Sequence, residues 1–369
     1  MTHLRVVHVT EASAGGVLQA ILIISQSQRD AGGNPELIIM SRPETEDDAS
    51  LAVKFGDSVR YRRVSGQGLI GACRLAAAIW KLRREKSTVI HAHSSKAGAI
   101  VRAIAFAGKF TGMVIYSPHG FAFLRTDVPP IVRRIYRFAE RILAHGCSLV
   151  ILASASEFDA ARRFIRADQL AIVENGVPVS LLPIRNKPVS QVPVVATLGR
   201  VAPQKRPDLF GSIARELIGL ARFVWIGGGD DSEAIDDLKR SGVEVTGWAP
   251  RDFALQELAN ADVFVLTSDW EGMPLALIEA QCIGLPAVVT NVVGNIDVVI
   301  DGQTGLIATD RASLVASVRA LLDDSNLRNV LSVGAVGQRE RFDSARIGIE
   351  MYAQYERTVA SRRSRSSGH

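Results

Sequence analysis

Short runs of consecutive apolar residues alternate with amphipathic stretches of helical length along most of this chain. A strand that is apolar at every position is buried on both faces, which is typical of parallel sheets covered by helices. In the first half this pattern predicts strands at Leu4–Val9, Glu36–Met40, Thr88–Ala92, Met113–Ser117, Leu149–Ala153 and Leu170–Val173, and helices at Val17–Ala31, Leu69–Arg84, Lys96–Phe106, Pro130–Ala144 and Glu157–Ile165.

A proline-rich segment interrupts the pattern at residues 182–193, where three prolines and no periodicity predict a linker. The second alternation predicts strands at Val194–Leu198, Phe223–Ile226, Val243–Thr246, Val263–Thr267 and Ala287–Thr290, and helices after Arg206, after Asp231 and over Leu275–Cys282. The 369 residues therefore fit an α/β protein with two Rossmann-like, doubly wound domains in tandem, at residues 1–182 and 193–342. The Ser- and Arg-rich tail, Ser361–His369, is expected to be disordered.

Composition limits the class of protein. Hydrophobic residues make up 47% and charged residues 22%, which indicates a packed globular protein. The three cysteines are far apart, so we expect a reducing compartment without disulfides or a zinc site. Neither a signal peptide nor a membrane span is recognisable, so a cytoplasmic protein is expected. Residues 1–190 carry 25 Lys and Arg against 15 Asp and Glu, a charge of +10, whereas residues 191–369 carry 18 against 23, a charge of −5. We therefore expect only the first half to meet an anionic surface or substrate.

Two cations follow the strand predicted at Val194–Leu198. Ligands of open α/β sheets bind beyond the carboxyl ends of the strands, and Arg200 and Lys205 lie there, around a turn that contains Pro203. Two fixed cations at a strand end can neutralise a pyrophosphate as its bond to a sugar breaks, without a metal. Cations in a turn are also common on solvated surfaces, so the spacing alone leaves both interpretations open.

A second cluster runs from Glu271 to Glu279. Pro274 suits the first turn of a helix, which puts Glu279 about one and a half turns into it. The neighbours of Glu279 are apolar, and a carboxylate on a buried helix face must be paired. Such a carboxylate can accept two hydrogen bonds from a ribose diol. The alternative is an exposed helical Glu279 with Glu271 favoured by the helix dipole, but the apolar neighbours favour the functional interpretation.

Glycines and histidines follow other predicted strands. Gly15-Gly16 and Gly227–Gly229 each lie between a strand and a helix, where backbone N–H groups can approach an anion, although tight turns also use glycine. The position of His119, before Gly120 at a strand end, favours a substrate contact, whereas His93 fits a contact or a structural role equally well. We find no ligand spacing typical of a metal site and no Asp-x-Asp motif, so neither a metal nor a cofactor is expected.

These clusters together resemble the family 4 retaining glycosyltransferases of the GT-B fold. The resemblance spans almost the whole chain in the family's order and rests on the E-x7-E pair Glu271 and Glu279, Gly199-Arg200 with Lys205, Glu174–Val177, Gly227–Gly229, Thr246–Trp248 and Gly294–Gly305. It is looser in the first half, where His119-Gly120 is similar to the family's His-Gly loop and Gly15-Gly16 to its glycine loop. Asp297 stands where many members carry Glu, which puts a carboxylate role there in doubt.

The resemblance implies transfer of a sugar from a nucleotide diphosphate, most often UDP, to a glycan or lipid-linked acceptor. It also implies a cleft between the two domains and a C-terminal helix, about residues 343–360, that packs back on the first domain. Arg200 and Lys205 would hold the diphosphate, Glu279 the ribose, Glu271 the sugar hydroxyls and His119 the transferring sugar. Further implied donor contacts are Gly15, Gly16, Gly227, Gly272, Met273, Pro274 and Leu275, and implied acceptor contacts are His93 and Phe121.

The helix predicted at Pro130–Ala144 carries a cationic stripe. On a helical wheel its four arginines fall within about 100° of one another, and they are Arg133, Arg134, Arg137 and Arg141. The wheel places Val132, Ile135, Ala139 and Ile142 on the opposite side. A solvated basic face would look the same, but many relatives build lipid-linked polysaccharides at the cytoplasmic leaflet. We therefore expect peripheral contact with an anionic membrane.

Two other classes of function are alternatives to sugar transfer. Sugar-nucleotide 2-epimerases share the two-domain fold but lack this E-x7-E context. A non-catalytic protein that binds a sugar nucleotide would keep the donor residues without turnover. Nucleic acid is not an expected partner, because the basic half shows no recognition motif and no interleaved aromatic residues.

Overall fold

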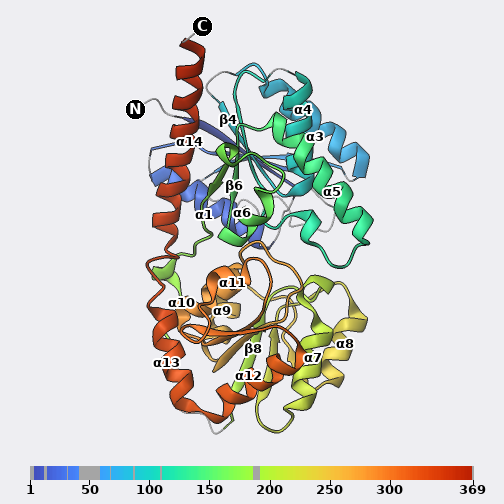
Figure 1. The fold of residues 1–369 in the computed structure, drawn as a ribbon, viewed down its shortest axis with the longest axis vertical. Helices are drawn as coiled ribbons and strands as arrows, with labels where there is room; N and C mark the ends of the chain where they lie inside the picture. The colour runs from blue at the N-terminus through green and yellow to red at the C-terminus, as the bar shows by residue number, and fades with distance from the viewer. Residues whose placement is uncertain are drawn as a thin grey trace. The chain divides into compact units, whose positions relative to one another are not determined.

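The structure is a computed structural model that describes residues 4–11, 15–30, 32–40, 59–66, 68–85, 88–108, 110–185 and 192–367. The chain divides into two compact units, each built on its own parallel sheet (Figure 1). Unit 1 comprises residues 1–124, 128–175 and 344–369, and unit 2 comprises residues 125–127 and 176–343. The middle of the predicted linker, residues 186–191, lies outside the described residues.

A seven-stranded sheet forms the centre of unit 1, with the strand order β3-β2-β1-β4-β5-β6-β7. Its strands are β1 (Arg5–Thr10), β2 (Glu36–Met40), β3 (Arg60–Val64), β4 (Thr88–His93), β5 (Met113–Ser117), β6 (Leu149–Leu152) and β7 (Leu170–Ile172). All neighbouring pairs are parallel. The chain reverses its direction of travel across the sheet between β1 and β4, and this topological switch point is where doubly wound sheets bind ligands.

Helices cover both faces of this sheet. On one face, Ile24 of α1 and Ile347 and Met351 of α14 pack against Val6 and Ile115. The opposite face is covered by α3 and α4, whose apolar side chains pack on the alternate strand residues. The helices of unit 1 are α1 (Gly16–Asp30), α3 (Gly68–Leu82), α4 (Ser95–Gly108), α5 (Pro130–Leu143), α6 (Ala155–Ala161) and α14 (Ser344–Ser367), with 3₁₀ turns η2 (Ala122–Leu124), η3 (Ala144–Gly146) and η4 (Ala167–Gln169).

The last helix, α14, returns to unit 1 after the chain has built unit 2. It crosses α1 at Gly348, where a Cβ atom would overlap the side chain of Ser27, so the close approach requires glycine. The helix continues to Ser367, and Arg362 donates hydrogen bonds to the carbonyls of Phe110 and Gly112. The tail for which disorder was predicted is thus described as helix as far as Ser367, while residues 368–369 lie outside the described residues.

Unit 2 repeats the architecture with six parallel strands in the order β10-β9-β8-β11-β12-β13, and its switch point lies between β8 and β11. The strands are β8 (Val194–Leu198), β9 (Arg222–Ile226), β10 (Val243–Val245), β11 (Val263–Leu266), β12 (Ala287–Thr290) and β13 (Gly305–Ala308). The helices are α7 (Pro207–Glu216), α8 (Ser232–Arg240), α9 (Arg251–Ala259), α10 (Leu275–Ile283), α11 (Asn295–Val298), α12 (Arg311–Asp323) and α13 (Ser325–Val336), with 3₁₀ turns η5 (Val179–Leu181) and η6 (Pro203–Lys205).

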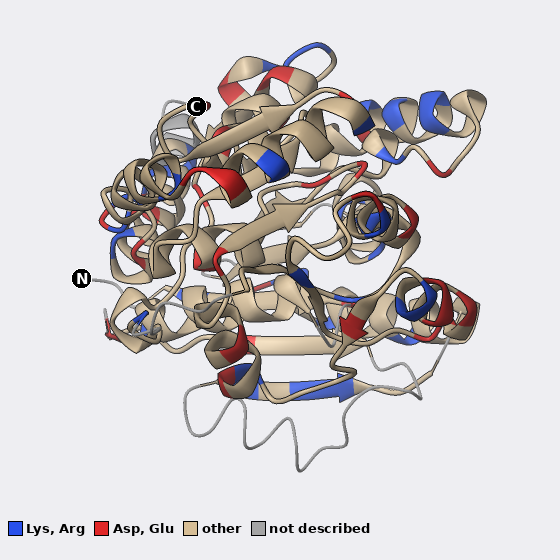
Figure 2. Cartoon of the chain, turned by 90° about the horizontal axis from the view of Figure 1, so that it is seen from below, with Lys and Arg blue, Asp and Glu red and all other residues tan. Residues whose placement is uncertain are grey.

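The two parallel sheets confirm the predicted α/β class. Most strands carry no charged residue, as the tan arrows of Figure 2 show, which is the burial on both faces that the apolar runs indicated. No helix within the described ranges combines the length and apolarity that a membrane crossing requires.

Candidate functional site

In unit 2, glycines bring two loops together at the ends of β8 and β9. A Cβ atom on Gly227 would overlap the carbonyl oxygen of Gly199, and both glycines have a positive φ, of 135° and 152°. The carbonyl of Gly199 also accepts a hydrogen bond of 2.8 Å from the indole of Trp225, and the N–H of Val201 donates to Gly228. Side chains larger than glycine would separate these loops, so the glycines fix the backbone from which Arg200 and Lys205 extend.

The three cations of the β8 loop differ in their partners. Arg200 is exposed and forms no hydrogen bond or ion pair with any residue that the structure describes. The ammonium of Lys205 lies 2.6 Å from Oε1 of Glu271, and both side chains are largely buried. Arg206 donates to Asp208 and Asp269, whose carboxylates raise the pKa of its guanidinium. Arg200 is thus the cation of this loop that is open to an anionic ligand.

The loops on the two sides of the switch point are joined by hydrogen bonds. The hydroxyl of Thr267 donates to the carbonyl of Lys205 at 2.7 Å, and the side-chain amide of Gln204 donates to the carbonyl of Trp270 at 2.8 Å. The N–H of Asp269 donates in return to the carbonyl of Gln204. These contacts hold Lys205 opposite Glu271, so the two predicted residues belong to one site. Gln204 was not predicted, because a neutral side chain in a turn gives no charge signal.

Glu279 lies inside unit 2, on a helix whose residues are almost all buried. Its side chain is 2% exposed and forms an ion pair with Arg251, the first residue of α9. Burial raises the pKa of the Glu279 carboxyl, while the charge of Arg251 opposes this shift. The sequence predicted a paired carboxylate here but not its partner, which α9 brings from 28 residues away.

The segment between Glu271 and Glu279 packs against the turn at Gly294. A Cβ atom on Gly294 would overlap the carbonyl of Gly272, and the N–H of Gly294 donates to Asp297 at 3.1 Å. The carboxylate of Asp297 therefore caps its own turn. The side chains of Met273 and Leu275 are buried, and Pro274 precedes the first residue of α10, so this segment offers its backbone rather than its side chains to a ligand.

In unit 1, Gly15 and Gly16 begin α1 beside the end of β1. Gly15 has a φ of 78° and open space where a Cβ atom would lie, and its carbonyl accepts from the N–H of Gln19 in the first turn. The first N–H groups of a helix lack partners within the helix, which suits an anion. Residues 12–14 of this loop lie outside the described residues.

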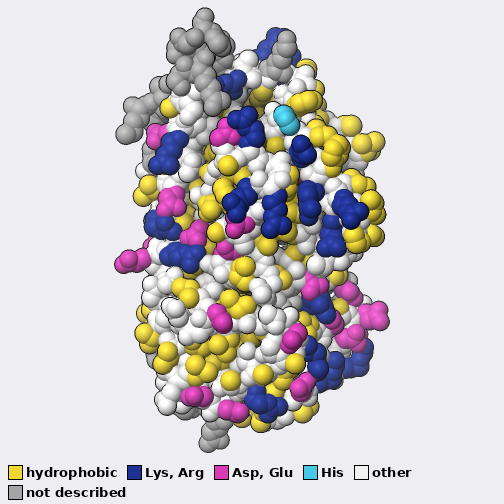
Figure 3. All heavy atoms as spheres, in the orientation of Figure 1, with side chains coloured by type: hydrophobic (Ala, Val, Ile, Leu, Met, Phe, Trp, Pro, Cys, Tyr) yellow, Lys and Arg dark blue, Asp and Glu magenta, His cyan; other side chains and the backbone are white. Residues whose placement is uncertain are grey.

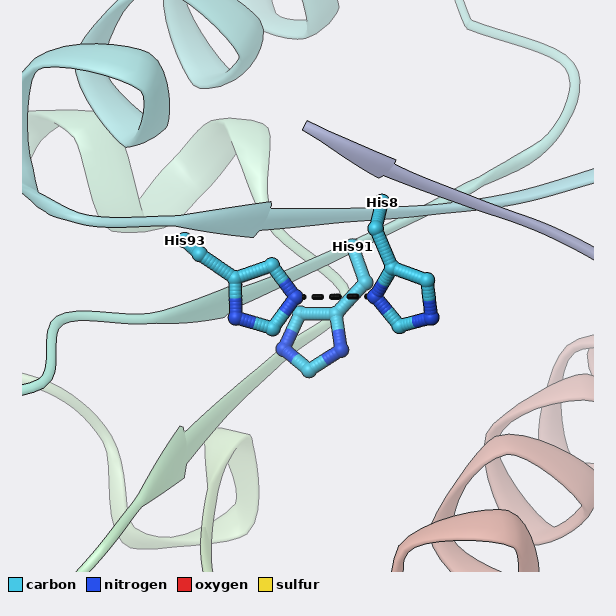
Figure 4. Close-up of side chains that lie close together, drawn as sticks. All are labelled: His8, His91 and His93. Carbon is cyan, nitrogen blue, oxygen red and sulfur yellow. Dashed lines mark hydrogen bonds between the residues drawn. The ribbon is translucent and has the colours of Figure 1, made fainter. Parts of the chain in front are cut away.

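Three histidines meet at the unit 1 switch point, in the middle of the sheet (Figure 4). His8 of β1 is in register with His91 of β4, and His93 follows two residues later on the same face. Nδ1 of His8 lies 2.9 Å from Nε2 of His93, and both nitrogens of His91 are hydrogen-bonded, to Tyr355 at 2.7 Å and to Ser117 at 2.9 Å. All three rings are fully buried, and burial lowers the pKa of His8 to about 4 and those of His91 and His93 well below the usual value.

These three imidazoles also satisfy the spacing of a metal site, since one ring nitrogen from each lies within 4.8 Å of the others. Neutral imidazole is a good ligand for zinc and related ions. However, both nitrogens of His91 and the facing nitrogens of His8 and His93 already take part in hydrogen bonds, so an ion would have to replace them. The described geometry is that of a hydrogen-bonded cluster.

His119 is held in a strained turn next to this cluster. Its φ is 52°, and the turn is fixed by Glu157, whose carboxylate accepts from the N–H of Gly120 and of Ala153 at 3.0 Å each. Nε2 of His119 lies 2.9 Å from Nδ1 of His93, and burial lowers the pKa of His119 to about 4. Backbone strain of this kind is often found at functional sites.

The two residues predicted to contact the acceptor are fully buried. The ring of Phe121 stacks on Phe123 at 4.7 Å between ring centroids and lies within the core of unit 1. His93 has no exposed surface either and faces His8 on one side and His119 on the other. Direct acceptor contact by Phe121 or His93 is therefore a prediction that this geometry argues against, because neither ring has surface to offer.

The sequence profile described as Glycosyltransferase Family 4 matches residues 14–181, and that described as Glycosyl transferases group 1 matches residues 192–324. UDP-Gal:alpha-D-GlcNAc-diphosphoundecaprenol alpha-1,3-galactosyltransferase of Escherichia coli is 30% identical over 282 residues, covering 68% of this chain and 70% of the relative. Sucrose-phosphate synthase from Thermosynechococcus elongatus superposes with a TM-score of 0.83 at 18% identity, over 97% of this chain and 100% of the other. Anabaena Alr3699/HepE, solved in complex with UDP and glucose, superposes with a TM-score of 0.78 at 16% identity, over 96% of this chain and 100% of the other.

Two doubly wound sheets, each with polar loops at its switch point, define the GT-B class of glycosyltransferases, and the solved structures share this fold. The chain belongs to glycosyltransferase family 4. The family resemblance drawn from Glu271, Glu279 and the glycine turns is therefore confirmed.

Proposed function

We propose that the chain is a retaining glycosyltransferase that takes its sugar from a UDP-sugar bound at the switch-point loops of unit 2. The observation that carries the proposal is the exposed Arg200, a cation without a partner among the described residues, beside the joined loops of Lys205 and Glu271. The name of the Escherichia coli relative, which includes a UDP-linked donor, supports the choice of nucleotide.

We propose that a bound donor replaces Glu271 as the partner of Lys205. A diphosphate placed between Arg200 and Lys205 competes with Glu271 for the ammonium of Lys205. The carboxylate released in this way is then free to accept hydrogen bonds from the sugar hydroxyls. Negative charge grows on the leaving phosphate as the glycosidic bond breaks, and the two cations stabilise it without a metal. The N–H groups of Gly15 and Gly16, at the start of α1, are proposed as further ligands of an anionic group.

Glu279 is the proposed ribose ligand. A carboxylate can accept from both hydroxyls of a ribose, and Arg251 already holds Glu279 in one orientation. Its burial makes the carboxylate strongly dependent on partners, because an unpaired buried charge is costly. The backbone of residues 272–275 and the turn at Gly227 would contact the rest of the donor. His119, the partly exposed ring in the strained turn of unit 1, is the proposed contact of the transferring sugar.

A glycan or lipid-linked acceptor is proposed from the Escherichia coli relative, whose name includes a diphosphoundecaprenol acceptor. The surface of α5 supports this choice. An apolar ridge is exposed there, with side chains 42–63% accessible at Ile131, Ile135, Phe138 and Ile142. The arginine stripe (Arg133, Arg134, Arg137 and Arg141) runs alongside it, and Figure 3 shows hydrophobic and basic side chains next to one another on this side of unit 1. A helix with both features suits the interface of an anionic membrane.

Product analysis with labelled UDP-sugars and a lipid-linked acceptor tests the proposal. A glycosylated acceptor with the anomeric configuration of the donor, determined by NMR, is the expected result. An isomeric UDP-sugar would instead identify a 2-epimerase, and donor binding without any product would identify a binding protein. An inverted product would refute the retaining mechanism while leaving the transferase intact.

A further inference from the structure

A row of four hydrogen-bonding side chains runs through unit 1 from the interior to the His119 turn. Oε1 of Gln28 lies 3.1 Å from Nε2 of His8, whose Nδ1 lies 2.9 Å from Nε2 of His93. Nδ1 of His93 then lies 2.9 Å from Nε2 of His119. We call Gln28, His8, His93 and His119 the histidine relay. The first three are buried, and His119 is the member with exposed surface.

Each imidazole of the relay uses one nitrogen toward each neighbour, so the protonation pattern of one ring dictates that of the next. A neutral imidazole has one N–H donor and one acceptor nitrogen. If the carbonyl oxygen of Gln28 accepts from Nε2 of His8, then Nδ1 of His8 must accept from Nε2 of His93. By the same rule, Nδ1 of His93 accepts from Nε2 of His119. The Nδ1 atom of His119, at the end of the row, is then left as an acceptor.

The relay keeps this direction only while its rings are neutral. A ring protonated on both nitrogens would donate in both directions and place two N–H groups head to head. Burial opposes such protonation, because it lowers the pKa values of His8, His93 and His119. Among the described residues, the hydrogen-bond partners of the relay rings are other imidazoles and an amide, with no carboxylate to stabilise a second proton.

We propose that Gln28 and His8 are positioning residues that act through His93 to fix the tautomer of His119, so that Nδ1 of His119 faces the reacting sugar as a hydrogen-bond acceptor. The group recognised would then be a sugar hydroxyl, which can donate, rather than a phosphate oxygen, which cannot. The sugar contact of His119 rests on the proposed function, whereas its tautomer does not. Gln28 lies on α1 and reaches His119 only through His8 and His93, and so extends the site beyond its motifs.

The first test is the tautomer itself, read from long-range ¹H–¹⁵N NMR spectra of the full-length protein at neutral pH. We expect the proton of His119 on Nε2 and a bare Nδ1. A proton on Nδ1 would overturn the proposal, because the relay would then run in the opposite direction. This measurement needs no variant and no substrate, so it does not depend on the proposed transferase reaction.

The second test removes the end of the relay. Gln28→Leu takes away the acceptor for His8 and should produce a mixture of His119 tautomers. Ser25→Ala is the matched control, because Ser25 is equally buried on α1 and its hydroxyl has no hydrogen-bond partner among the described residues. Circular dichroism shows whether each variant is folded. An unchanged tautomer in folded Gln28→Leu would overturn the proposal.

Kinetics connect the tautomer to the reaction. With a UDP-sugar that the wild type turns over, Gln28→Leu should lower kcat about tenfold, the effect of one hydrogen bond, while the donor KM stays within about twofold. If the tautomer shifts but kcat is unchanged, His119 does not contact the sugar, and the site assignment fails rather than the relay. Zinc bound at one equivalent and lost in His8→Asn would also overturn the relay, since these rings would then be metal ligands.

Discussion

Acidification should destabilise unit 1 while leaving unit 2 almost unchanged. Burial lowers the pKa of His8 from 6.5 to about 4. Between pH 6.5 and about pH 4, His8 is therefore protonated in the unfolded chain but neutral in the folded unit. The stabilisation by neutral His8 is therefore complete above pH 6.5 and is lost as the pH falls toward 4. Unit 2 contains no histidine, because all seven lie at positions 3, 8, 91, 93, 119, 145 and 369.

The size of the effect follows from the pKa shift. At about pH 5 the solution is about one and a half pH units below the pKa of His8 in the unfolded chain. Each of these units changes the free energy of unfolding by about 1.36 kcal/mol. The opening free energy of unit 1 should thus fall by about 2 kcal/mol from His8 alone, which is about a thirtyfold loss of protection against hydrogen exchange. His91, His93 and His119 also have pKa values lowered by burial, so they add to this loss.

Native-state hydrogen exchange by mass spectrometry can separate the two units. After correction for the intrinsic pH dependence of exchange, peptides from β1 and β4 should lose protection, and peptides from β8 and β11 should not. The pKa of the Glu279 carboxyl is raised in the folded state, so its uptake of a proton stabilises unit 2 as the pH falls. His8→Asn should reduce the pH response, whereas His145→Asn, at an exposed ring, should not. Equal losses in both units, or none in β1 and β4, would refute the reasoning.

Further predictions concern the donor site and the membrane. Glu279→Ala should weaken donor binding by about 1.5–3 kcal/mol in calorimetry. The control Glu244→Ala, which removes an exposed ion pair with Arg222, should leave donor affinity unchanged. Equal donor affinities for the wild type and Glu279→Ala would remove Glu279 from the site. Arg200→Ala and Lys205→Ala should each lower kcat more than they raise donor KM, because they act on the leaving phosphate; a raised KM at full kcat would contradict this. Activity should survive EDTA, and loss of activity restored by manganese would disprove the metal-free mechanism. Changing the arginine stripe to Glu should abolish co-sedimentation with anionic vesicles at low salt, where the four cations contribute at most roughly 4 kcal/mol; wild-type protein that stays in the supernatant would refute membrane contact.

The fold could be predicted largely from the sequence because its central strands are apolar throughout. The strand β3 was missed, since its sequence, Arg-Tyr-Arg-Arg-Val, resembles a charged loop. It lies at the edge of the sheet, where charged side chains remain in solvent and discourage pairing with other chains. The strand β13 and the helices α9, α11, α12 and α13 were also not predicted. β13 and α9 are short, with four and nine residues, and short elements give weak periodic signals.

The candidate site was predicted only as separate clusters. Lys205 and Glu271 are 66 residues apart, and they pair because the order of the sheet places β8 beside β11. His8 looked like an ordinary strand residue, and only the register of β1 with β4 brings it next to His91 and His93. Charge and spacing therefore identified the residues that carry chemistry, whereas the residues that orient them depend on contacts that no local pattern encodes.

The helix α5 shows how such a contact decides the role of an amphipathic pattern. The helical wheel placed Ile135 and Ile142 opposite the arginines, as if they faced a core, yet both are exposed. The residue that α5 buries is Glu140, whose carboxylate lies 2.7 Å from Arg102 and 3.2 Å from the hydroxyl of Tyr116. A buried ion pair adds little net stability but fixes orientation, since removing one partner is costly. This polar anchor turns the apolar ridge outward beside the arginine stripe, and the exposed apolar surface supports the proposed contact with an anionic membrane.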